Sequence, residues 1–314
     1  LRPVLVRKIV DLVRGSGGEP FVTDTTTLYP KRRRTAQGYL ETAAGNGFTE
    51  ETVGAPIVIA DGEEGYDGAR IPVRKRVAGC ELREVEVAEA IARADAMVVV
   101  THVKGHALAG LGGSIKNVAM GCATKPSKAA QHMLNRPVLD GSLCDGCGIC
   151  AELCLYGALA MEEGLPVRDP GRCMSCSNCL FSCPQEAFRW PEGCKEGMQV
   201  YMAHTAQTVL SVFPRRRVAF LNFVQDVSSL CDCQPLAGRP IVQDVGILSS
   251  LDIVSIDKAS LDLVDQAQPI PGSGSVDPPD RLGKTHKTSS LVQLETAERL
   301  GMGSLSYRLI TVAP

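Results

Sequence analysis

Apolar positions along the chain fall into short runs that alternate with stretches of helical periodicity. The apolar and alternating runs predict strands over residues 19–25, 55–62, 82–87, 96–102, 217–226 and 239–246. The helical stretches predict helices over residues 3–14, 35–44, 87–94, 114–121 and 249–267. The run AMVVVTH at 96–102 is nearly all apolar, which is typical of a strand buried on both faces.

This alternation of strands and helices predicts the fold class. It indicates an α/β protein with a mostly parallel sheet flanked by helices. Pro and Gly residues over 268–287 predict a loop, and residues 288–312 predict a last helix and strand. The chain starts at Leu1 directly in a helical pattern. Since a helix that opens an α/β unit usually follows a strand, we expect a further segment before Leu1.

Composition and charge narrow the class of protein. A chain of 314 residues with 44% apolar residues can build an α/β core and one small extra module, which excludes a disordered or fibrous protein. The net charge of -2 gives no general case for nucleic acid or membrane as a partner, and the short basic runs at 31–34, 74–76 and 215–217 favour solvated turns or strand edges. Neither a membrane-length apolar run nor a signal peptide is evident, so we expect a cytoplasmic protein.

Eight of the thirteen cysteines form two copies of the spacing C-x2-C-x2-C-x3-C, which is the bacterial ferredoxin spacing for [4Fe-4S] clusters. In this arrangement the fourth cysteine of each copy ligates the other cluster. The predicted ligands are therefore Cys144, Cys147, Cys150 and Cys183 for cluster 1, and Cys173, Cys176, Cys179 and Cys154 for cluster 2. Zinc sites and disulfide knots lack this paired triple spacing. Leu155 stands where proline usually follows the fourth cysteine, which affects the turn and not the ligands.

The cysteine motifs predict a small inserted domain. Residues 140–190 are predicted to form an α+β ferredoxin-like domain, inserted in a discontinuous α/β domain made of 1–139 and 191–314. The insert holds seven acidic residues and three arginines, a local charge near -4. A protein that exchanges electrons with it is expected to present a basic surface.

A second candidate site lies where the strand 96–102 ends, because ligands of parallel α/β sheets bind outside the carboxyl ends of the strands. His102, Lys104, His106 and Lys116 are the tentative catalytic residues there, since they supply proton donors and positive charge. The following turn, with Gly110, Gly112, Gly113 and Ser114, predicts a close backbone approach and a helix N-terminus that attracts a phosphate or carboxylate. A purely structural glycine turn, and two histidines that share no ligand, remain open alternatives.

Other polar residues have two interpretations each. Cys231 and Cys233 flank Asp232 and could hold a soft metal or act as redox thiols, although two buried reduced cysteines are also ordinary. Lys125, Lys128 and His132 could extend the cationic site or lie on a solvated helix face. The remaining thiols show no partner spacing and are expected to be core or surface cysteines: Cys80, Cys122 and Cys194.

The long motifs PFVTDTTTLY, IVIADG, HVKGHALAGLGGSIKNVAMGC and CDCQPLAGRPIVQDVGILSSLDIVSIDKAS, together with the inserted cysteine motifs, resemble the DUF362 family in its ferredoxin-containing form. The resemblance covers nearly the whole chain. It implies an iron-sulfur protein with a redox role and names no substrate. Members usually begin with an extra segment before the position of Leu1, in line with the expectation from the helix pattern.

Three functions are compatible with these features. In the first, an iron-sulfur oxidoreductase passes electrons from two [4Fe-4S] clusters to a ligand held between His102 and Lys116. In the second, the protein is an electron carrier that docks a redox partner protein and turns over no small molecule. In the third, a metal-cofactor maturation factor uses the histidines and the C-x-C pair as transient ligands. The sequence identifies no small-molecule substrate, and oxygen-sensitive clusters favour a reducing cytoplasm.

Overall fold

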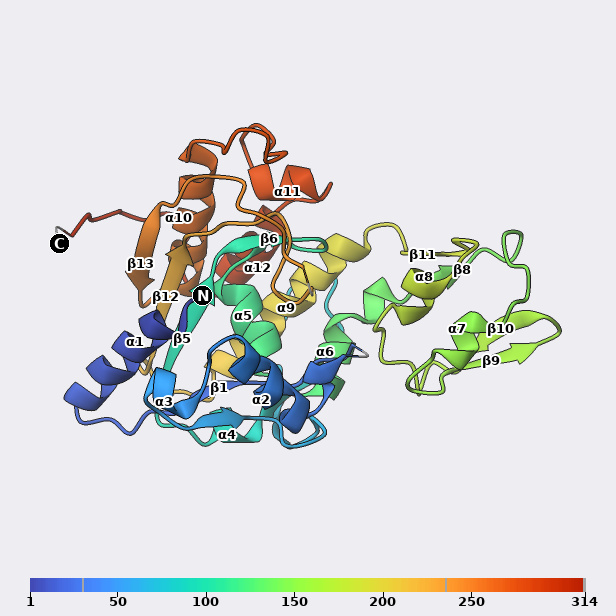
Figure 1. Ribbon diagram of the computed structural model, residues 1–314, viewed down its shortest axis with the longest axis horizontal. Helices are drawn as coiled ribbons and strands as arrows, with labels where there is room; N and C mark the ends of the chain where they lie inside the picture. Colours follow the sequence, from blue (N-terminus) through green and yellow to red (C-terminus); the bar gives the residue numbers. More distant parts are fainter. Residues whose placement is uncertain (30, 235, 313–314) are drawn as a thin grey trace.

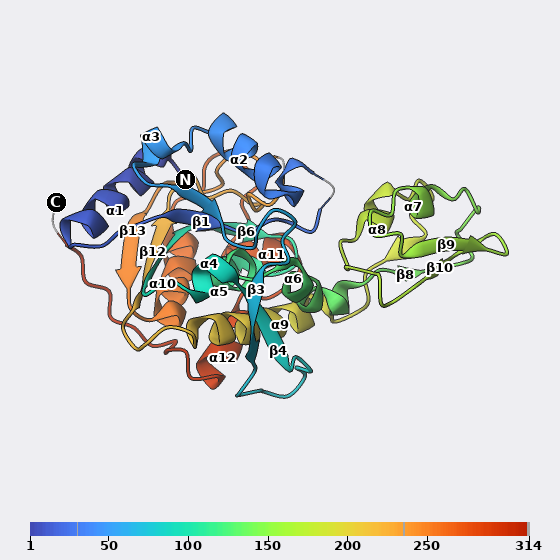
Figure 2. The same ribbon diagram turned by 90° about the horizontal axis from the view of Figure 1, so that it is seen from below.

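A computed structural model describes residues 1–29, 31–234 and 236–312 of the chain. They form a larger α/β body and a smaller cysteine-rich segment that lies to one side of it (Figures 1 and 2). The central sheet of the body has the order β13-β12-β5. In it, β12 (Val218–Val224) pairs in parallel with β5 (Met97–His102) and antiparallel with β13 (Gly246–Ser250).

The other strands of the body form separate two-stranded sheets. These are the parallel pair β1 (Val22–Asp24) and β2 (Ile57–Ile59), and the antiparallel pairs β3 (Gly68–Pro72) with β4 (Glu84–Ala88) and β6 (Lys104–His106) with β7 (Gly110–Gly112). The mixed α/β class is confirmed, but the prediction of a mostly parallel sheet is wrong. Most strand pairs among the described residues are antiparallel. β3–β4 and β6–β7 follow one another along the chain without the crossover helix that a parallel pair needs.

Helices cover these small sheets. They are α1 (Pro3–Gly15), α2 (Ala36–Gly45), α3 (Glu50–Val53), α4 (Glu89–Ala92), α5 (Ser114–Gly121), α6 (Lys125–Gln131), α9 (Cys194–Leu210), α10 (Ile253–Gln266), α11 (Arg281–Thr285) and α12 (Leu291–Arg299), with 3-10 turns at Arg32–Arg34 and Met133–Asn135. Helix α9 packs against α5 and α12 through the middle of the body (Figure 2). It is buried on most sides, so its sequence has no strong apolar stripe and helical periodicity does not predict it.

Several predicted elements differ in extent. The predicted helix 87–94 is a single turn, α4, preceded by the end of β4. The predicted strand 239–246 contains only isolated bridges, and the strand of this region, β13, begins at Gly246. Among residues 300–312 the structure has no strand. A short apolar run predicts a buried segment, whereas pairing also needs a neighbouring strand in register, which local sequence does not specify.

The core of the body lies between the central sheet and helices α5, α9 and α10. Val99 and Phe220 from the sheet meet Ile115, Met198 and Ile253 from the three helices, and all five are nearly or fully buried. Helix α10 starts where the Asp252 side chain accepts hydrogen bonds from the N–H groups of the first turn. This packing holds the carboxyl end of β5 in a fixed position.

The cysteine-rich segment has its own strands and a small apolar cluster. Strand β8 (Val138–Leu139) pairs with β11 (Phe188–Arg189) at its base, and β9 (Leu159–Glu162) pairs with β10 (Leu165–Arg168). Two short helices, α7 (Ile149–Glu152) and α8 (Asn178–Ser182), complete it. Its buried cluster of Cys150, Leu159 and Phe188 is separate from the main core. The division into two domains at residues 140 and 190 stays a prediction.

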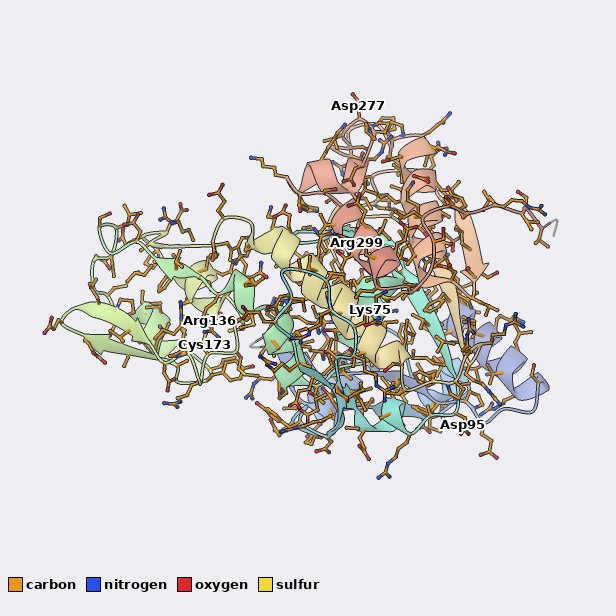
Figure 3. The ribbon with its side chains drawn as sticks, turned by 180° about the vertical axis from the view of Figure 1, so that it is seen from behind. Lys75, Asp95, Arg136, Cys173, Asp277 and Arg299 are labelled. Atoms are coloured by element: carbon orange, nitrogen blue, oxygen red, sulfur yellow. The ribbon has the colours of Figure 1, made fainter. Side chains whose placement is uncertain are left out.

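Contacts from both sides connect the segment to the body. Arg136 Nη2 donates to the carbonyl oxygen of Cys173 at 3.4 Å, and Figure 3 shows the two residues side by side at the junction. The Tyr156 hydroxyl donates to the carbonyl oxygen of Leu28 at 2.8 Å. Of the helices that the structure describes, none is both long and apolar enough to cross a membrane.

Candidate functional site

Two small cavities in the cysteine-rich segment gather the cysteines of the repeated motifs. One is lined by Cys144, Cys147, Cys150 and Cys183. The other is lined by Cys154, Cys173, Cys176 and Cys179, together with Cys150. Each cavity therefore combines three cysteines of one copy with the fourth cysteine of the other copy. That is the grouping expected for two four-cysteine cluster sites.

The two copies share one backbone conformation around these cavities. Gly146 and Gly148 in the first copy have φ of 76°, in the left-handed region. Ser175 and Ser177 at the equivalent positions of the second copy have φ of 54° and 59°. A non-glycine residue in this region costs about 1–2 kcal/mol. The second loop therefore keeps the shape that points its thiols inward although its sequence disfavours it.

The fourth cysteine of each copy also accepts a backbone hydrogen bond. Ala158 N lies 3.2 Å from Cys154 Sγ, and Ala187 N lies 3.4 Å from Cys183 Sγ. Both donors lie four residues after the cysteine. Hydrogen bonds to ligand sulfurs stabilise the thiolate form and tune the potential of a bound cluster.

At the end of β5, His102 and Lys104 hold one carboxylate. His102 Nδ1 lies 2.8 Å from Asp232 Oδ2, and Lys104 Nζ lies 3.1 Å from the same oxygen. The other ring nitrogen of His102 contacts the carbonyl oxygen of Gln225 at 2.9 Å. Burial alone would raise the pKa of Asp232, but the His102 hydrogen bond and the Lys104 charge outweigh it and lower this pKa. Both predicted catalytic side chains therefore help to fix Asp232.

Asp232 is the middle residue of the C-x-C pair, so these contacts fix the segment 228–233, which we call the C-x-C loop. Arg33 Nη2 donates to the carbonyl oxygens of Asp232 and Cys233 at 3.2 and 3.0 Å. Gly105 N donates to Ser228 O at 2.8 Å, and a Cβ on Gly105 would lie 2.0 Å from Ser229 O. Glycine is needed at this position because the loop packs directly on the β6 backbone.

The C-x-C loop brings both thiols to the other two predicted residues. His106, Cys231 and Cys233 have ligand atoms that all lie within 4.8 Å of one another. Lys116 Nζ, from α5, lies 3.1 Å from Cys231 Sγ. Cys233 N donates to the same sulfur at 3.3 Å. His106 and Cys231 are buried. The structure therefore joins the β5-end residues and the C-x-C pair, which are separate features of the sequence, in one site.

The hydrogen bonds of His106 fix its protonation. Its Nδ1 accepts from Leu108 N at 3.3 Å and from Ala109 N at 3.1 Å. Burial, with the nearby Lys116 charge, lowers the pKa of His106 to about 3, so the ring is neutral. A neutral ring whose Nδ1 lone pair is in use carries its proton on Nε2. His106 therefore offers a donor to the site and has no free lone pair.

The two thiols differ in protonation. The hydrogen bond from Cys233 lowers the pKa of Cys231 well below its usual value, and the Lys116 charge adds to this against the effect of burial. The same thiol-thiol hydrogen bond raises the pKa of Cys233, as does its burial. Burial would lower the pKa of Lys116, but the two cysteines outweigh it and raise this pKa. The Lys116 ammonium therefore favours the thiolate form of Cys231 over that of Cys233.

Changing Lys116 to Met is expected to shift the alkylation of Cys231 to higher pH. Losing a charge-assisted hydrogen bond worth about 1.5–3 kcal/mol raises the thiol pKa by about 1–2 units. The measurement is the rate of iodoacetamide labelling of Cys231 against pH, read by mass spectrometry. Lys8→Met, on the exposed face of α1, is the control. An unchanged pH midpoint in Lys116→Met would show that the ammonium does not stabilise the thiolate.

The glycine-rich turn differs from its predicted role as an anion site. Ser114 N and Ile115 N, at the start of α5, donate to the Asp257 carboxylate at 2.7 and 2.8 Å. A Cβ on Gly113 would lie 2.5 Å from Asp257 Oδ1, and a Cβ on Gly110 would lie 2.3 Å from Ser290 Oγ. Gly113 is the N-cap of α5, and Ser114 is its first helical residue. A side chain from α10 thus takes the place of the predicted phosphate or carboxylate ligand, and Gly110, Gly112, Gly113 and Ser114 pack inside the protein.

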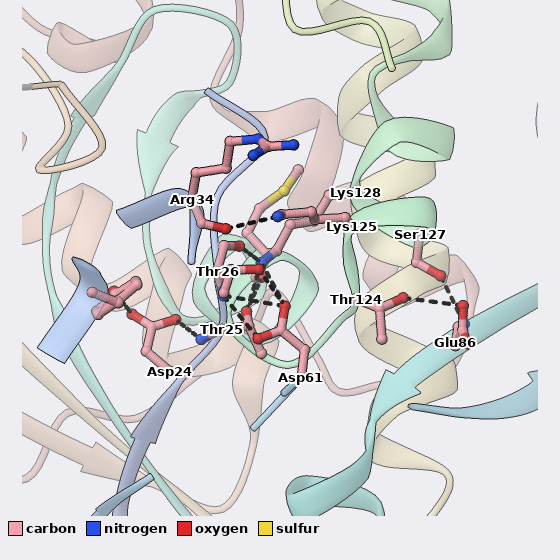
Figure 4. Close-up of polar contacts among 12 residues, drawn as sticks. Asp24, Thr25, Thr26, Arg34, Asp61, Glu86, Thr124, Lys125, Ser127 and Lys128 are labelled. Carbon is pink, nitrogen blue, oxygen red and sulfur yellow. Dashed lines mark hydrogen bonds and ion pairs between the residues drawn. The ribbon is translucent and has the colours of Figure 1, made fainter. Parts of the chain in front are cut away.

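The cations after α5 form a separate buried network (Figure 4). Lys128 Nζ donates to Thr25 Oγ1 at 2.7 Å and to Thr26 O, and lies 4.0 Å from Asp61 Oδ2. Lys125 Nζ donates to the carbonyl oxygens of Arg34 and Glu64, both at 2.7 Å. Both lysines are buried, so the alternative of a solvated helix face is wrong. His132 is also buried, and its Nδ1 contacts Lys128 O at 2.8 Å.

Residues 28, 29 and 31–34 lie between the second cysteine cavity and the C-x-C loop. Arg34 lies over the ring of Tyr156, 5.8 Å from its centroid, and Tyr156 lines the cavity. Arg33 contacts the C-x-C loop from the next position along the chain. Burial raises the pKa of the Tyr29 hydroxyl, and the charges of Cys233, Cys231 and Cys176 raise it further. Tyr29 is therefore near both groups of cysteines, and residues 33 and 34 are not the solvated basic turn that the sequence favoured.

Comparisons with known proteins give one family match and one partial match to a relative. A family model described as "Domain of unknown function (DUF362)" matches residues 1–262. A stretch of 43 residues is 42% identical to one subunit of the Na(+)-translocating ferredoxin:NAD(+) oxidoreductase complex of Acetobacterium woodii. That match covers 13% of this chain and 13% of the subunit, so the chain spans a small part of this relative's length. No solved structure matches the chain.

Proposed function

The chain belongs to the DUF362 family, and we propose that it is an iron-sulfur redox protein that passes electrons from two [4Fe-4S] clusters to a ligand at the end of β5. The observation that carries the proposal is the grouping of eight cysteines around two cavities. Each cavity is lined by the first three cysteines of one copy and the fourth cysteine of the other, and Cys150 lines both. The donor set fits the cofactor, because four thiolates are what each [4Fe-4S] cluster needs. The left-handed loop positions in both copies support the same geometry.

Bound clusters would supply one-electron transfer, and the residues of the chain would do the rest. The Ala158 and Ala187 N–H groups stabilise the thiolates of Cys154 and Cys183. Cluster 2 would lie in the cavity that Tyr156 lines, on the side of the segment that contacts Leu28. Electrons would leave from there toward the C-x-C loop, because Arg33 and Arg34 connect the two regions.

The four residues predicted at the end of β5 have two roles in this proposal. His102 and Lys104 are positioning residues, because their side chains hold Asp232. Lys116 and His106 face the thiols and are the proton donors of the site, with the ammonium 3.1 Å from Cys231 Sγ. This division differs from the sequence-based hypothesis, in which all four residues faced the ligand.

An electron-donating partner would dock on the cysteine-rich segment. Its surface excess of acidic residues suits a partner protein with a basic patch. The relative that shares identity over 43 residues is, by its name, part of a ferredoxin:NAD(+) oxidoreductase complex, which supports an electron-transfer role for this stretch. A simple electron carrier would have the same acidic surface. It would not need the buried thiol site of Cys231 and Cys233, which Arg33 and Arg34 connect to the cysteine-rich segment.

Metal-cofactor maturation is the second candidate. It is favoured by the spacing of His106, Cys231 and Cys233, whose ligand atoms lie within 4.8 Å of one another. The hydrogen bonds to His106 Nδ1 count against it, because the ring would have to give up two backbone partners or its proton to bind a metal. We therefore rank it below electron transfer.

Metal and sulfide analysis of anaerobically purified protein tests the proposal. Two [4Fe-4S] clusters require about eight iron and about eight sulfide per chain, with paramagnetic resonance signals after reduction. Zinc in place of iron, or no sulfide, would contradict the cluster assignment. Eight iron with an additional stoichiometric metal would favour the maturation function.

Changing His102 to Ala is expected to loosen the C-x-C loop and leave the clusters intact. The charge-assisted hydrogen bond to Asp232 is worth about 1.5–3 kcal/mol, so amide exchange over residues 228–233 should rise about 10- to 100-fold. Hydrogen exchange read by mass spectrometry measures this. Arg2→Ala is the control, because its pair with Asp226 near the same loop is exposed and contributes little. Equal exchange in both variants would exclude His102 as a positioning residue.

A further inference from the structure

The C-x-C loop holds two thiols whose sulfurs lie within 4.8 Å of each other. We infer that Cys231 and Cys233 form a redox-active dithiol/disulfide couple that is the electron acceptor at the end of β5. For its electron supply the inference rests on the proposed function, but the couple itself does not. Bond formation requires the two sulfurs to close to about 2.05 Å, which side-chain rotation within one short loop can provide.

The surroundings of the loop suit such a couple because they fix its backbone. Asp232 is held by His102 and Lys104, and Arg33 holds the carbonyl oxygens of Asp232 and Cys233. His286 contacts Ser229 O at 2.5 Å from the opposite side. A dithiol that is held in place loses little conformational entropy when its disulfide forms.

Three groups provide the chemistry of thiol-disulfide interconversion. Lys116 and the N–H of Cys233 lie 3.1 and 3.3 Å from Cys231 Sγ, and both stabilise the thiolate, which is the reactive form. The neutral His106 ring presents a proton donor on the same side. One thiolate, one thiol and two neighbouring proton donors are the components that forming and breaking a disulfide require.

The same hydrogen bonds argue against a resident three-ligand metal. A metal on His106 needs a ring lone pair, while Nδ1 already accepts two backbone N–H groups and the proton stays on Nε2. The Lys116 ammonium at Cys231 Sγ also supplies the positive charge that a metal would bring to the thiolate. The cluster of three residues is therefore better explained as a redox thiol pair with its own proton donors.

The number of electrons that two clusters deliver also matches the number that one disulfide needs. Reducing the disulfide breaks one S–S bond and takes up two electrons and one proton, which leaves Cys233 as a thiol and Cys231 as the thiolate paired with Lys116. Each reduced [4Fe-4S] cluster delivers one electron, so two clusters together supply the two electrons of one disulfide. Lys116 and His106 lie where this proton is needed, and solvent reaches the site at half-exposed Asp232. The reduced partner protein then reduces the clusters again. If electrons flow in the opposite direction, the dithiol is the electron donor and the clusters are the acceptors.

The test uses the anaerobic holoprotein and follows one peptide. Tryptic cleavage after Arg217 and Lys258 gives peptide 218–258, because Pro240 blocks cleavage at Arg239, and Cys231 and Cys233 are its only cysteines. The protein is equilibrated with mixtures of reduced and oxidised dithiothreitol, quenched with iodoacetamide and digested. The expected result is one two-electron transition between a peptide with two labels and a disulfide peptide without label. In a second sample, dithionite-reduced clusters should lose their paramagnetic signal as the disulfide becomes dithiol.

Each outcome decides part of the inference. A peptide 218–258 that stays a dithiol over the whole series, in protein whose clusters are reducible, overturns the couple and leaves the proposed function standing. A disulfide that cycles in protein without clusters supports the couple and overturns the proposed function. A stoichiometric metal that is retained by the protein and lost in Cys231→Ser overturns the couple in favour of a metal site. Cys233→Ser should keep its reduced-cluster signal, whereas the control Cys122→Ser should lose it as the unchanged protein does.

Discussion

Changing Cys154 to Ala is expected to remove the cluster held by the second copy of the motif, and changing Cys183 to Ala is expected to remove the cluster held by the first copy. Iron should fall from about eight to about four per chain in each variant, because each fourth cysteine completes the other copy's cluster. The structure supports this crossed pattern, since Cys183 lines the cavity with Cys144 and Cys147, and Cys154 lines the cavity with Cys176.

The crossed pattern can be checked by labelling the thiols that the missing cluster releases. In Cys183→Ala the thiols of Cys144, Cys147 and Cys150 should become labelled by iodoacetamide, and in Cys154→Ala those of Cys173, Cys176 and Cys179 should. The reverse pattern would show that each copy of the motif ligates its own cluster. Cys194→Ala is the control, because this buried thiol in α9 lines neither cavity, and it should keep about eight iron.

The grouping of the eight motif cysteines could be predicted from the sequence because the spacing within each motif is local. Three cysteines within seven residues need only one tight loop to converge, and this loop occurs in both copies although glycines are replaced by Ser175 and Ser177. The strands 19–25, 55–62, 96–102 and 217–226 were located for a similar reason, since their apolar runs mark burial. The mixed α/β class followed from these elements.

The sequence did not predict contacts that depend on which elements pack together. Asp257 is an ordinary helical residue in the sequence, yet its carboxylate fills the turn that looked free for an anion. Tyr29 ends the motif PFVTDTTTLY and Arg33 lies in a short basic run, but neither pattern indicated a role at the C-x-C loop, where the fold places Arg33. The acid between the two cysteines was visible, but its role in holding the loop depends on His102 and Lys104 lying opposite it.

The prediction of the sheet arrangement was wrong for the same physical reason. A run such as 239–246 has the composition of a buried strand, and its residues do lie inside the protein at Ile241 and Val242. Its neighbours are loops, so only isolated bridges form. Burial can be read from local composition, whereas pairing depends on distant segments.

Changing Lys128 to Met is expected to destabilise the α/β body more than any surface substitution. Asp61 is fully buried and would keep its hydrogen bonds from Thr26 but lose the cation at 4.0 Å, and Thr25 would lose its donor. Removing one partner of a buried pair costs about 3–5 kcal/mol. For a chain of this size the melting temperature should fall by roughly 5–10 °C. Calorimetry or circular dichroism of the anaerobic holoprotein measures it.

Two further variants distinguish the effect of the buried charge on stability from the effect of losing any lysine. Lys258→Met removes a partly exposed pair with Asp262 within α10 and should lower the free energy of unfolding by less than about 1 kcal/mol. In the double variant Lys128→Met with Asp61→Asn, part of the loss should be regained, because the residual carboxylate charge is gone. Equal melting temperatures in the Lys128 and Lys258 variants would exclude a structural role for the buried pair.

The pH dependence gives an independent check of the same network. Burial lowers the pKa of Lys128 to about 8 in the folded protein, against 10.5 for a free lysine, although Asp61 opposes the shift. Between these two values the unfolded chain binds more protons at this residue than the folded chain, so this lysine makes stability rise with pH across the window. The Lys128→Met variant lacks that contribution. The difference between its free energy of unfolding and that of the unchanged protein should therefore widen from pH 8 to pH 10. A deficit that stays constant would show that Lys128 titrates normally and that solvent reaches the network.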